Sequence, residues 1–147
     1  RIFSIYEGTT QLQVVAAVRY ITNGTYLNII KEMLLNDVAD ELRPLKERVA
    51  KMVDLYAEAV EKVKASDNQA EHDFLARRLY NMTGDIIMSL LILTDATKAP
   101  ELFAKSAQVY VRAAEEEVVG HAAYVMAFND DDLKNFVAEE TNDEAEA

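Results

Sequence analysis

Apolar side chains recur every three or four residues along most of the chain, which is the spacing of one face of an α-helix. Only four glycines and two prolines interrupt the 147 residues. The pattern predicts an all-α protein with five substantial helices and a short closing piece. The helices are predicted over about residues 9–22, 25–42, 44–65, 69–97 and 100–128, and the short piece over 133–137.

Turn and capping residues mark the ends of these helices. A hydroxyl at Thr9 or Thr10 can accept hydrogen bonds from the free N–H groups at the start of the first helix. A proline in the first turn of a helix costs no hydrogen bond, because its missing N–H has no partner there. The other boundaries rest on the same residue types: Thr22-Asn23-Gly24, Pro44, Ser66-Asp67-Asn68, Pro100 and Asn129-Asp130.

Each predicted helix carries one apolar face that should form the core. In the first two helices this face is Leu12, Val15, Ala16 and Tyr20, then Leu27, Ile30, Leu34, Val38 and Leu42. In the third and fourth it is Leu45, Val49, Met52, Tyr56, Val60 and Val63, then Leu75, Leu79, Met82, Ile86, Leu90 and Leu93. The fifth presents Phe103, Ala107, Tyr110, Ala114, Val118, His121 and Val125.

Gly84 lies inside the fourth helix, where glycine costs about 1 kcal/mol relative to alanine. Either a neighbouring helix packs closely against it or the helix is locally weak, and close packing is the interpretation we favour. Long helices with short connections favour antiparallel neighbours. We therefore predict an up-and-down four-helix bundle over residues 24–138, preceded by a short segment and helix over 1–23 and followed by an acidic tail over 139–147.

The net charge of −11 weighs against a nucleic-acid or anionic-membrane surface, because acids outnumber bases 26 to 15. The chain has no cysteine and hence no disulfide or thiolate site, which is compatible with a reducing cytosol and a cytoplasmic location. No apolar run reaches the roughly 18–20 residues of a membrane helix.

One stretch has an unusual choice of residues for a plain bundle. Residues 5–13, IYEGTTQLQ, place a glutamate before a glycine at the start of the first helix. A carboxylate there stands where the backbone can approach a ligand closely, and the free N–H groups of a helix N-terminus can bind a polar group. The same Glu-Gly-Thr-Thr sequence also suits a simple capping turn.

This nonapeptide resembles the C-terminal signature of the acyl-CoA dehydrogenase family, I-Y-E-G-T-[ST]-x-[IL]-Q, and matches it at every position. The resemblance implies that Glu7 is the catalytic base that removes the α-proton of an acyl-CoA thioester. It implies that the backbone of Gly8 lies against the substrate. Finally, it implies that Thr9, Thr10 and Gln11 contact FAD.

The resemblance also implies the wider setting of the chain. Residues 1–23 are then the end of the catalytic helical domain, and the flavin domain and middle sheet lie before Arg1. Electron-transfer flavoprotein is the expected acceptor, and a homo-oligomer is expected. We expect the isolated piece to bind neither FAD nor acyl-CoA tightly. Val14 stands where the family often has arginine, and the long extension resembles the helical C-terminal bundle of a bacterial subgroup.

Other polar residues receive simpler interpretations. Glu117 and His121 are four apart, but one such pair is more often a hydrogen-bonded histidine than a metal site, so no metal is predicted. His72 is expected to be solvated. The remaining residues are expected to be packing tyrosines or solvated acids: Tyr56, Tyr80, Tyr110, Tyr124, Glu115-Glu116-Glu117 and Asp130-Asp131-Asp132.

Two rival functions stay open beside the enzyme. The bundle can be a structural module for subunit contacts, with no chemistry of its own, and this is compatible with a catalytic role for residues 5–13. Alternatively, the chain is a free-standing adaptor, in which case the motif is a coincidence.

Overall fold

The structure is a computed structural model of the chain, and it describes residues 9–135. Within that range the chain forms helices and no strand, so the all-α prediction is confirmed. The elements are α2 (Thr9–Thr22), α3 (Thr25–Leu34), the short 3₁₀ helix η1 (Asp40–Leu42), α4 (Arg43–Ala65), α5 (Gln69–Lys98), α6 (Pro100–Ala127) and α7 (Asp130–Lys134).

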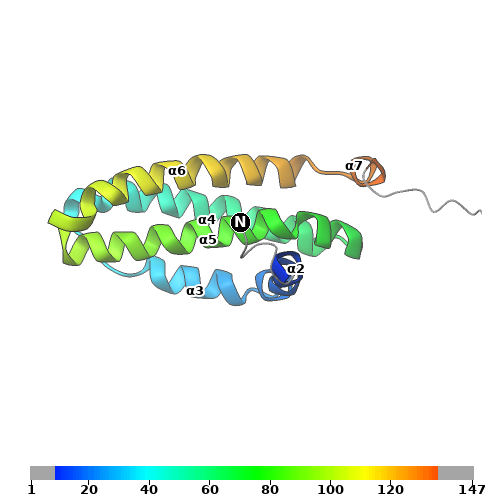
Figure 1. Cartoon of the computed structure of the whole chain (residues 1–147), viewed down its shortest axis with the longest axis horizontal. Helices are drawn as coiled ribbons and strands as arrows, with labels where there is room; N and C mark the ends of the chain where they lie inside the picture. The colour runs from blue at the N-terminus through cyan, green and yellow to red at the C-terminus, as the bar shows by residue number, and fades with distance from the viewer. Residues whose placement is uncertain (1–8, 136–147) are drawn as a thin grey trace, which may run out of the picture.

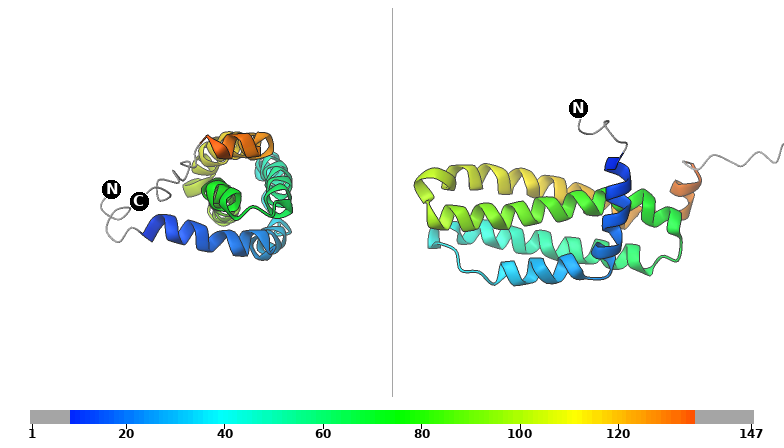
Figure 2. Two further views of the ribbon diagram at one scale, coloured as in Figure 1. Left: turned by 90° about the vertical axis from the view of Figure 1, so that its right-hand side faces the viewer. Right: turned by 60° about the horizontal axis from the view of Figure 1, so that its bottom comes forward.

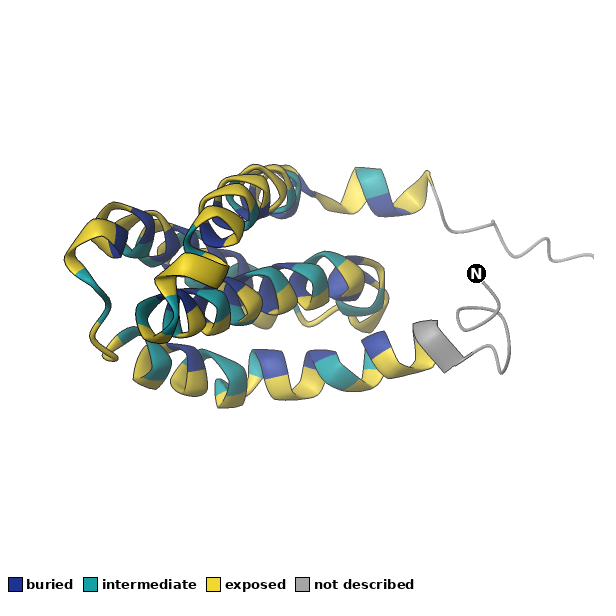
Figure 3. Cartoon of the chain, turned by 60° about the vertical axis from the view of Figure 1, so that its left-hand side comes forward, coloured by how far each residue is buried: buried dark blue, intermediate teal, exposed yellow. Residues whose placement is uncertain are grey.

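The three long helices α4, α5 and α6 lie side by side along the bundle, and the shorter α3 runs next to them (Figure 1). α2 crosses α5 steeply and projects away from the bundle (Figure 2). Each long helix turns one buried face inward (Figure 3). The bundle prediction is thus confirmed, with α3 as a short fourth member.

The predicted core faces of α4 and α5 are buried at every position. Tyr56 is 0% exposed and its hydroxyl oxygen lies 2.8 Å from Thr83 Oγ1, which in turn lies 2.8 Å from the Leu79 carbonyl oxygen. A threonine hydroxyl carries one proton, so a consistent arrangement has Tyr56 donating to Thr83 and Thr83 donating to Leu79. Burial raises the pKa of Tyr56 to about 12.

The predicted core face of the first helix is wrong. α2 buries Val14, Val18 and Ile21, whereas Leu12 is 69% and Tyr20 51% exposed. The helix is apolar on most sides, so periodicity alone does not single out one face. Packing on α5 selects the face that is buried.

The second helix ends earlier than predicted. α3 stops at Leu34, Val38 lies in the following loop, and Leu42 belongs to η1. Asn36 and Asp37 favour a turn here. Tertiary hydrogen bonds hold the loop: Lys46 Nζ donates to the Asn36 carbonyl (2.7 Å), and the Ala39 N–H donates to Thr97 Oγ1 (3.2 Å).

The predicted boundary residues act as expected at several turns. Gly24 has φ 87°, the left-handed region that glycine tolerates best, and it separates α2 from α3. The Asn68 side chain accepts from the Ala70 N–H (3.0 Å) at the start of α5. Ala99 alone connects α5 to α6, and Pro100 occupies the first turn of α6.

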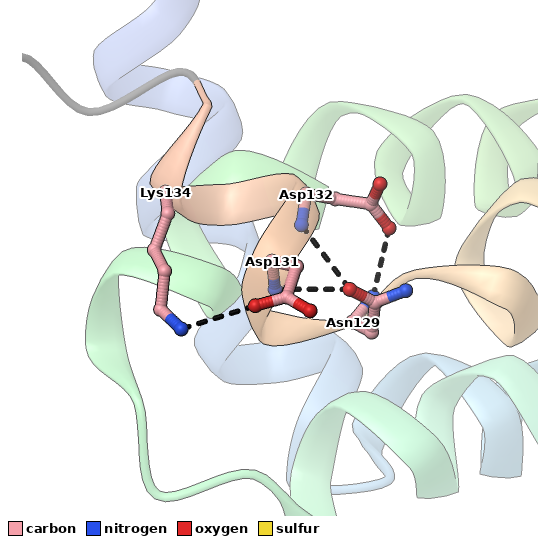
Figure 4. A network of polar contacts seen from close by, with 4 residues as sticks. All are labelled: Asn129, Asp131, Asp132 and Lys134. Carbon is pink, nitrogen blue, oxygen red and sulfur yellow. Dashed lines mark hydrogen bonds and ion pairs between the residues drawn. The ribbon is translucent and has the colours of Figure 1, made fainter.

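The closing helix α7 starts three residues before the predicted short piece. Asn129 caps it, with Oδ1 accepting from the N–H groups of Asp131 (2.9 Å) and Asp132 (3.2 Å) (Figure 4). The Asp132 side chain accepts in return from the Asn129 N–H (3.1 Å), and Lys134 pairs with Asp131 (3.0 Å). Asp132, one of the aspartates predicted to be solvated, therefore also completes a capping box with Asn129.

Candidate functional site

The predicted catalytic segment leads directly into α2. Glu7 and Gly8 lie outside the described residues, so their roles stay predictions. Thr9, Thr10 and Gln11 form the first turn of α2, as the capping pattern indicated. The first N–H groups of a helix have no carbonyl partner within it, so the backbone of this turn can donate to a ligand.

α2 is anchored to the bundle by Val14, Val18 and Ile21, which are 1%, 6% and 0% exposed. Burying such side chains stabilises each by roughly 1.5–3 kcal/mol. The helix that follows the motif is therefore held firmly on α5, while its side with Leu12 and Tyr20 is exposed.

A groove of about 590 Å³ opens over the middle of α5. Its walls come from α2 and α3 on one side and from α6 on the other. The lining residues are Ala17, Ile21, Tyr26, Tyr80, Asn81, Thr83, Gly84, Asp85, Ile87, Met88, Glu117 and His121. The groove is largely apolar, with polar groups gathered along its α6 edge.

Gly84 lies on the floor of this groove. A Cβ built on it meets no atom within 4 Å, so the predicted close approach of a neighbouring helix is wrong among the described residues. The position is exposed rather than packed. Gly84 instead leaves an open notch in the surface of α5.

The polar edge is centred on His121. Arg78 Nη1 lies 3.2 Å from His121 Nδ1, and its guanidinium carbon lies 3.5 Å from the centre of the Tyr124 ring. Because a guanidinium can only donate, Nδ1 accepts and the neutral ring carries its proton on Nε2. Nε2 faces Glu117 Oε2 at 3.8 Å, so the predicted shared face of Glu117 and His121 is confirmed.

Asp85 lines the groove and has a raised pKa. Burial raises its pKa first and the nearby Glu117 charge raises it further, while the positive charge of His121 when protonated and a hydrogen bond with Tyr110 lower it. Burial and the Asp85 charge likewise raise the pKa of Tyr110. These groups give the groove a polar edge, but they do not form a nucleophile and base pair.

Other predicted residues have clear places. His72 is half-buried and its Nε2 lies 2.7 Å from the Ser66 carbonyl oxygen, so the expectation that it is solvated is wrong. Glu115 pairs with Arg48 across helices (2.6 Å). Tyr56 is a core residue, as expected, whereas Tyr80 is 44% exposed.

Residues 9–135 contain neither a metal-binding cluster nor a membrane-spanning helix. No group of three or more histidines and acids in this range is arranged to hold a metal ion. None of its helices has the length and apolar character needed to cross a membrane.

The groove could not be seen in the main periodicity of α5, because that periodicity marks the core face. Tyr80, Gly84 and Met88 recur every four residues on the opposite side. This second, partly apolar face of α5 is the sequence pattern that could have indicated the groove.

The chain is similar in sequence and in structure to known proteins. Residues 22–133 match the sequence model of a family described as acyl-CoA dehydrogenase C terminal. The chain is also similar to the crystal structure of the acyl-CoA dehydrogenase family protein from Porphyromonas gingivalis, with 36% sequence identity and a TM-score of 0.71. That match covers 78% of this chain and 98% of the other. No curated protein matches.

Proposed function

Because the chain belongs to the acyl-CoA dehydrogenase family, we propose that it is the C-terminal part of an FAD-dependent enzyme that dehydrogenates an acyl-CoA thioester between its α and β carbons. The observation that carries the proposal is the signature at residues 5–13, which is complete and whose residues 9–13 begin α2. Family membership rests on residues 22–133, outside that signature, so the two observations are independent.

Glu7 is the proposed base, and it removes the α-proton of the thioester. A carboxylate serves this purpose when its surroundings are apolar and dry, because desolvation raises its pKa toward that of a useful base. The backbone of Gly8 is proposed to lie against the thioester, where the lack of a side chain permits close approach. FAD, when bound, supplies the acceptor for the hydride that leaves the β carbon.

The start of α2 is compatible with a polar cofactor. Its first turn comprises Thr9, Thr10 and Gln11, whose N–H groups can donate outside the helix. We propose these three residues as the FAD contacts of this chain. Electron-transfer flavoprotein is the proposed acceptor of the electrons. The isolated chain is not expected to hold FAD, because the resemblance places the flavin domain outside these residues.

Replacing Glu7 in the complete enzyme tests the proposal. Glu7→Gln keeps the shape of the side chain but removes the base, so the rate of acyl-CoA dehydrogenation should fall by about 10²–10⁴-fold or more. The rate is measured with a panel of saturated acyl-CoA thioesters and an artificial electron acceptor. Flavin absorbance of the purified variant should be unchanged, which separates loss of the base from loss of the cofactor.

Glu41→Gln is a matched control, because Glu41 is an exposed glutamate in η1. It should leave the rate unchanged. Near-normal turnover of Glu7→Gln with full flavin content would exclude Glu7 as the base.

A second candidate function is a non-catalytic interaction module, and a specific observation favours it. The outer face of α5 carries exposed large apolar side chains beside the groove, among them Tyr80 and Met88. Such a face is typical of a binding surface.

A further inference from the structure

The outer face of α5 carries a row of exposed residues. Tyr80, Met88 and Leu91 are 44%, 50% and 45% exposed, and Gly84 lies between them. Single exposed apolar residues are ordinary, but here three large ones follow one helix at intervals that keep them on one side. α5 packs against α2, α3, α4, α6 and α7, and among residues 9–135 no other helix covers its remaining side (Figure 2, left).

The shape of this side suits another helix. The groove of about 590 Å³ runs along it, and Gly84 leaves a notch in which a Cβ would meet no atom within 4 Å. A large side chain from a second helix can enter this notch. Helices that approach at a glycine pack with their axes unusually close, which increases their contact.

Residues along this side of α5 also form pairs that are equally spaced about position 86. Gly84 and Met88 lie two positions on either side of this centre. In the same way, Asn81 and Leu91 lie five positions from it, and Arg77 and Asp95 lie nine positions from it. A second copy of α5 running in the opposite direction therefore sets Met88 over the Gly84 notch and Leu91 beside Asn81. The same register brings Asp95 to Arg77, so opposite charges meet at both ends.

We propose that this row is a self-complementary interface through which two copies of the chain form an antiparallel dimer. A twofold axis requires one patch to match itself, and the Gly84–Met88 pair satisfies that requirement in size and the Arg77–Asp95 pair in charge. The pairing at the ends needs only opposite charges at positions 77 and 95, whatever contacts Arg77 makes within its own chain. The proposal does not depend on dehydrogenase activity, because its tests measure association alone.

Cysteine crosslinking tests the register, because the chain has no cysteine of its own. The double variant Asn81→Cys, Leu91→Cys should give a covalent dimer under mild oxidation, seen on a non-reducing gel. Positions 81 and 91 of one helix are about 15 Å apart, too far for a disulfide within a copy. The single variants are matched controls and should stay uncrosslinked, since each new cysteine faces the other position across the interface.

Sedimentation equilibrium of the 147-residue chain tests the association itself. The wild-type chain should approach twice its 16.5 kDa with rising concentration. Met88→Glu should weaken the dimer at least tenfold, because it places charge in the interface. Gly84→Leu should weaken it similarly by filling the notch, yet its monomer should melt no lower than wild type, since the site is open and leucine favours helix.

Charge exchange separates the proposed pairing from a local effect. Asp95→Arg should weaken the dimer, and adding Arg77→Asp in the same chain should restore it. Several results overturn the proposal: a wild-type chain that stays monomeric up to about 1 mM, a dimer unaffected by both Met88→Glu and Gly84→Leu, or crosslinking by the single cysteines as efficient as by the pair. A monomer that binds another protein on this face also counts against a second copy as its occupant.

Discussion

The buried hydroxyl of Tyr56 makes a quantitative prediction about alkaline stability. Tyr56 is 0% exposed, and burial raises its pKa from 10.0 to about 12. In the unfolded chain the tyrosine has its ordinary pKa and loses its proton first as the pH rises. Between pH 10 and 12 the folded state therefore binds more protons than the unfolded state, so the free energy of unfolding falls with rising pH.

The size of this effect follows from the two pKa values. One pKa unit corresponds to about 1.36 kcal/mol, so the contribution of Tyr56 falls by roughly 2–3 kcal/mol between pH 10 and 12. Below pH 10 the folded protein retains the full stabilising contribution of Tyr56. Tyr56→Phe removes this contribution and, at neutral pH, costs about 1 kcal/mol for the lost hydrogen bond. The cost stays small because Thr83 can still donate to the Leu79 carbonyl.

The order of stability of the wild type and Tyr56→Phe should therefore reverse between neutral and high pH. At pH 7 the wild type should be more stable than Tyr56→Phe by about 1 kcal/mol, and near pH 12 the variant should be more stable by about 1–2 kcal/mol. Urea unfolding followed by circular dichroism at pH values from 7 to 12 measures both curves. Other titrating groups are common to both chains, so the difference isolates Tyr56. Curves that stay parallel up to pH 12 would refute the reasoning.

Three further predictions concern the helices. Gly120→Ala adds a methyl group in open space and should raise the free energy of unfolding by about 0.5–1 kcal/mol, whereas Gly24→Ala at φ 87° should lower it by about 1–2 kcal/mol. Urea unfolding of both variants should therefore show changes in stability of opposite sign, and changes of the same sign would contradict the backbone argument. Asn129→Ala removes the capping box of α7 and should cost that helix about 1 kcal/mol, so hydrogen exchange at the Asp131 and Asp132 amides should accelerate without change in α5. Leu79→Ala leaves a cavity at a fully buried position and should cost about 2–5 kcal/mol in urea unfolding; a loss below about 1 kcal/mol would mean that Leu79 is not in a tightly packed core.

The core faces of α4 and α5 could be predicted from the sequence because each helix has a single clear apolar face. The predicted face of α6 was wrong at Phe103, which is 37% exposed. The stripes of α4 and α5 are buried as predicted, and the prolines at positions 44 and 100 begin helices as expected. α2 could not be predicted in the same way. Its apolar residues surround the helix, and only docking on α5 decides that Val14 rather than Leu12 is buried.

Features set by contacts distant in the sequence were also missed. The loop that follows the early end of α3 is held by the Ala39–Thr97 hydrogen bond, which joins segments far apart in the chain. The environment of Gly84 depends on how α2, α3 and α6 are spaced around α5, which no local pattern encodes. The proposed catalytic residue Glu7, by contrast, is indicated by a short local signature and lies outside the described residues.

The one-residue connection at Ala99 has a consequence for the order of folding. α5 and α6 pack against each other, and the pairs nearest Ala99 are close in sequence, so their contacts cost little loop-closure entropy. α2 meets α5 across a much longer stretch of chain. We expect the α5–α6 hairpin to be largely formed in the folding transition state, with high φ-values for Leu93 and Ala107, and α2 to dock late, with a low φ-value for Val18.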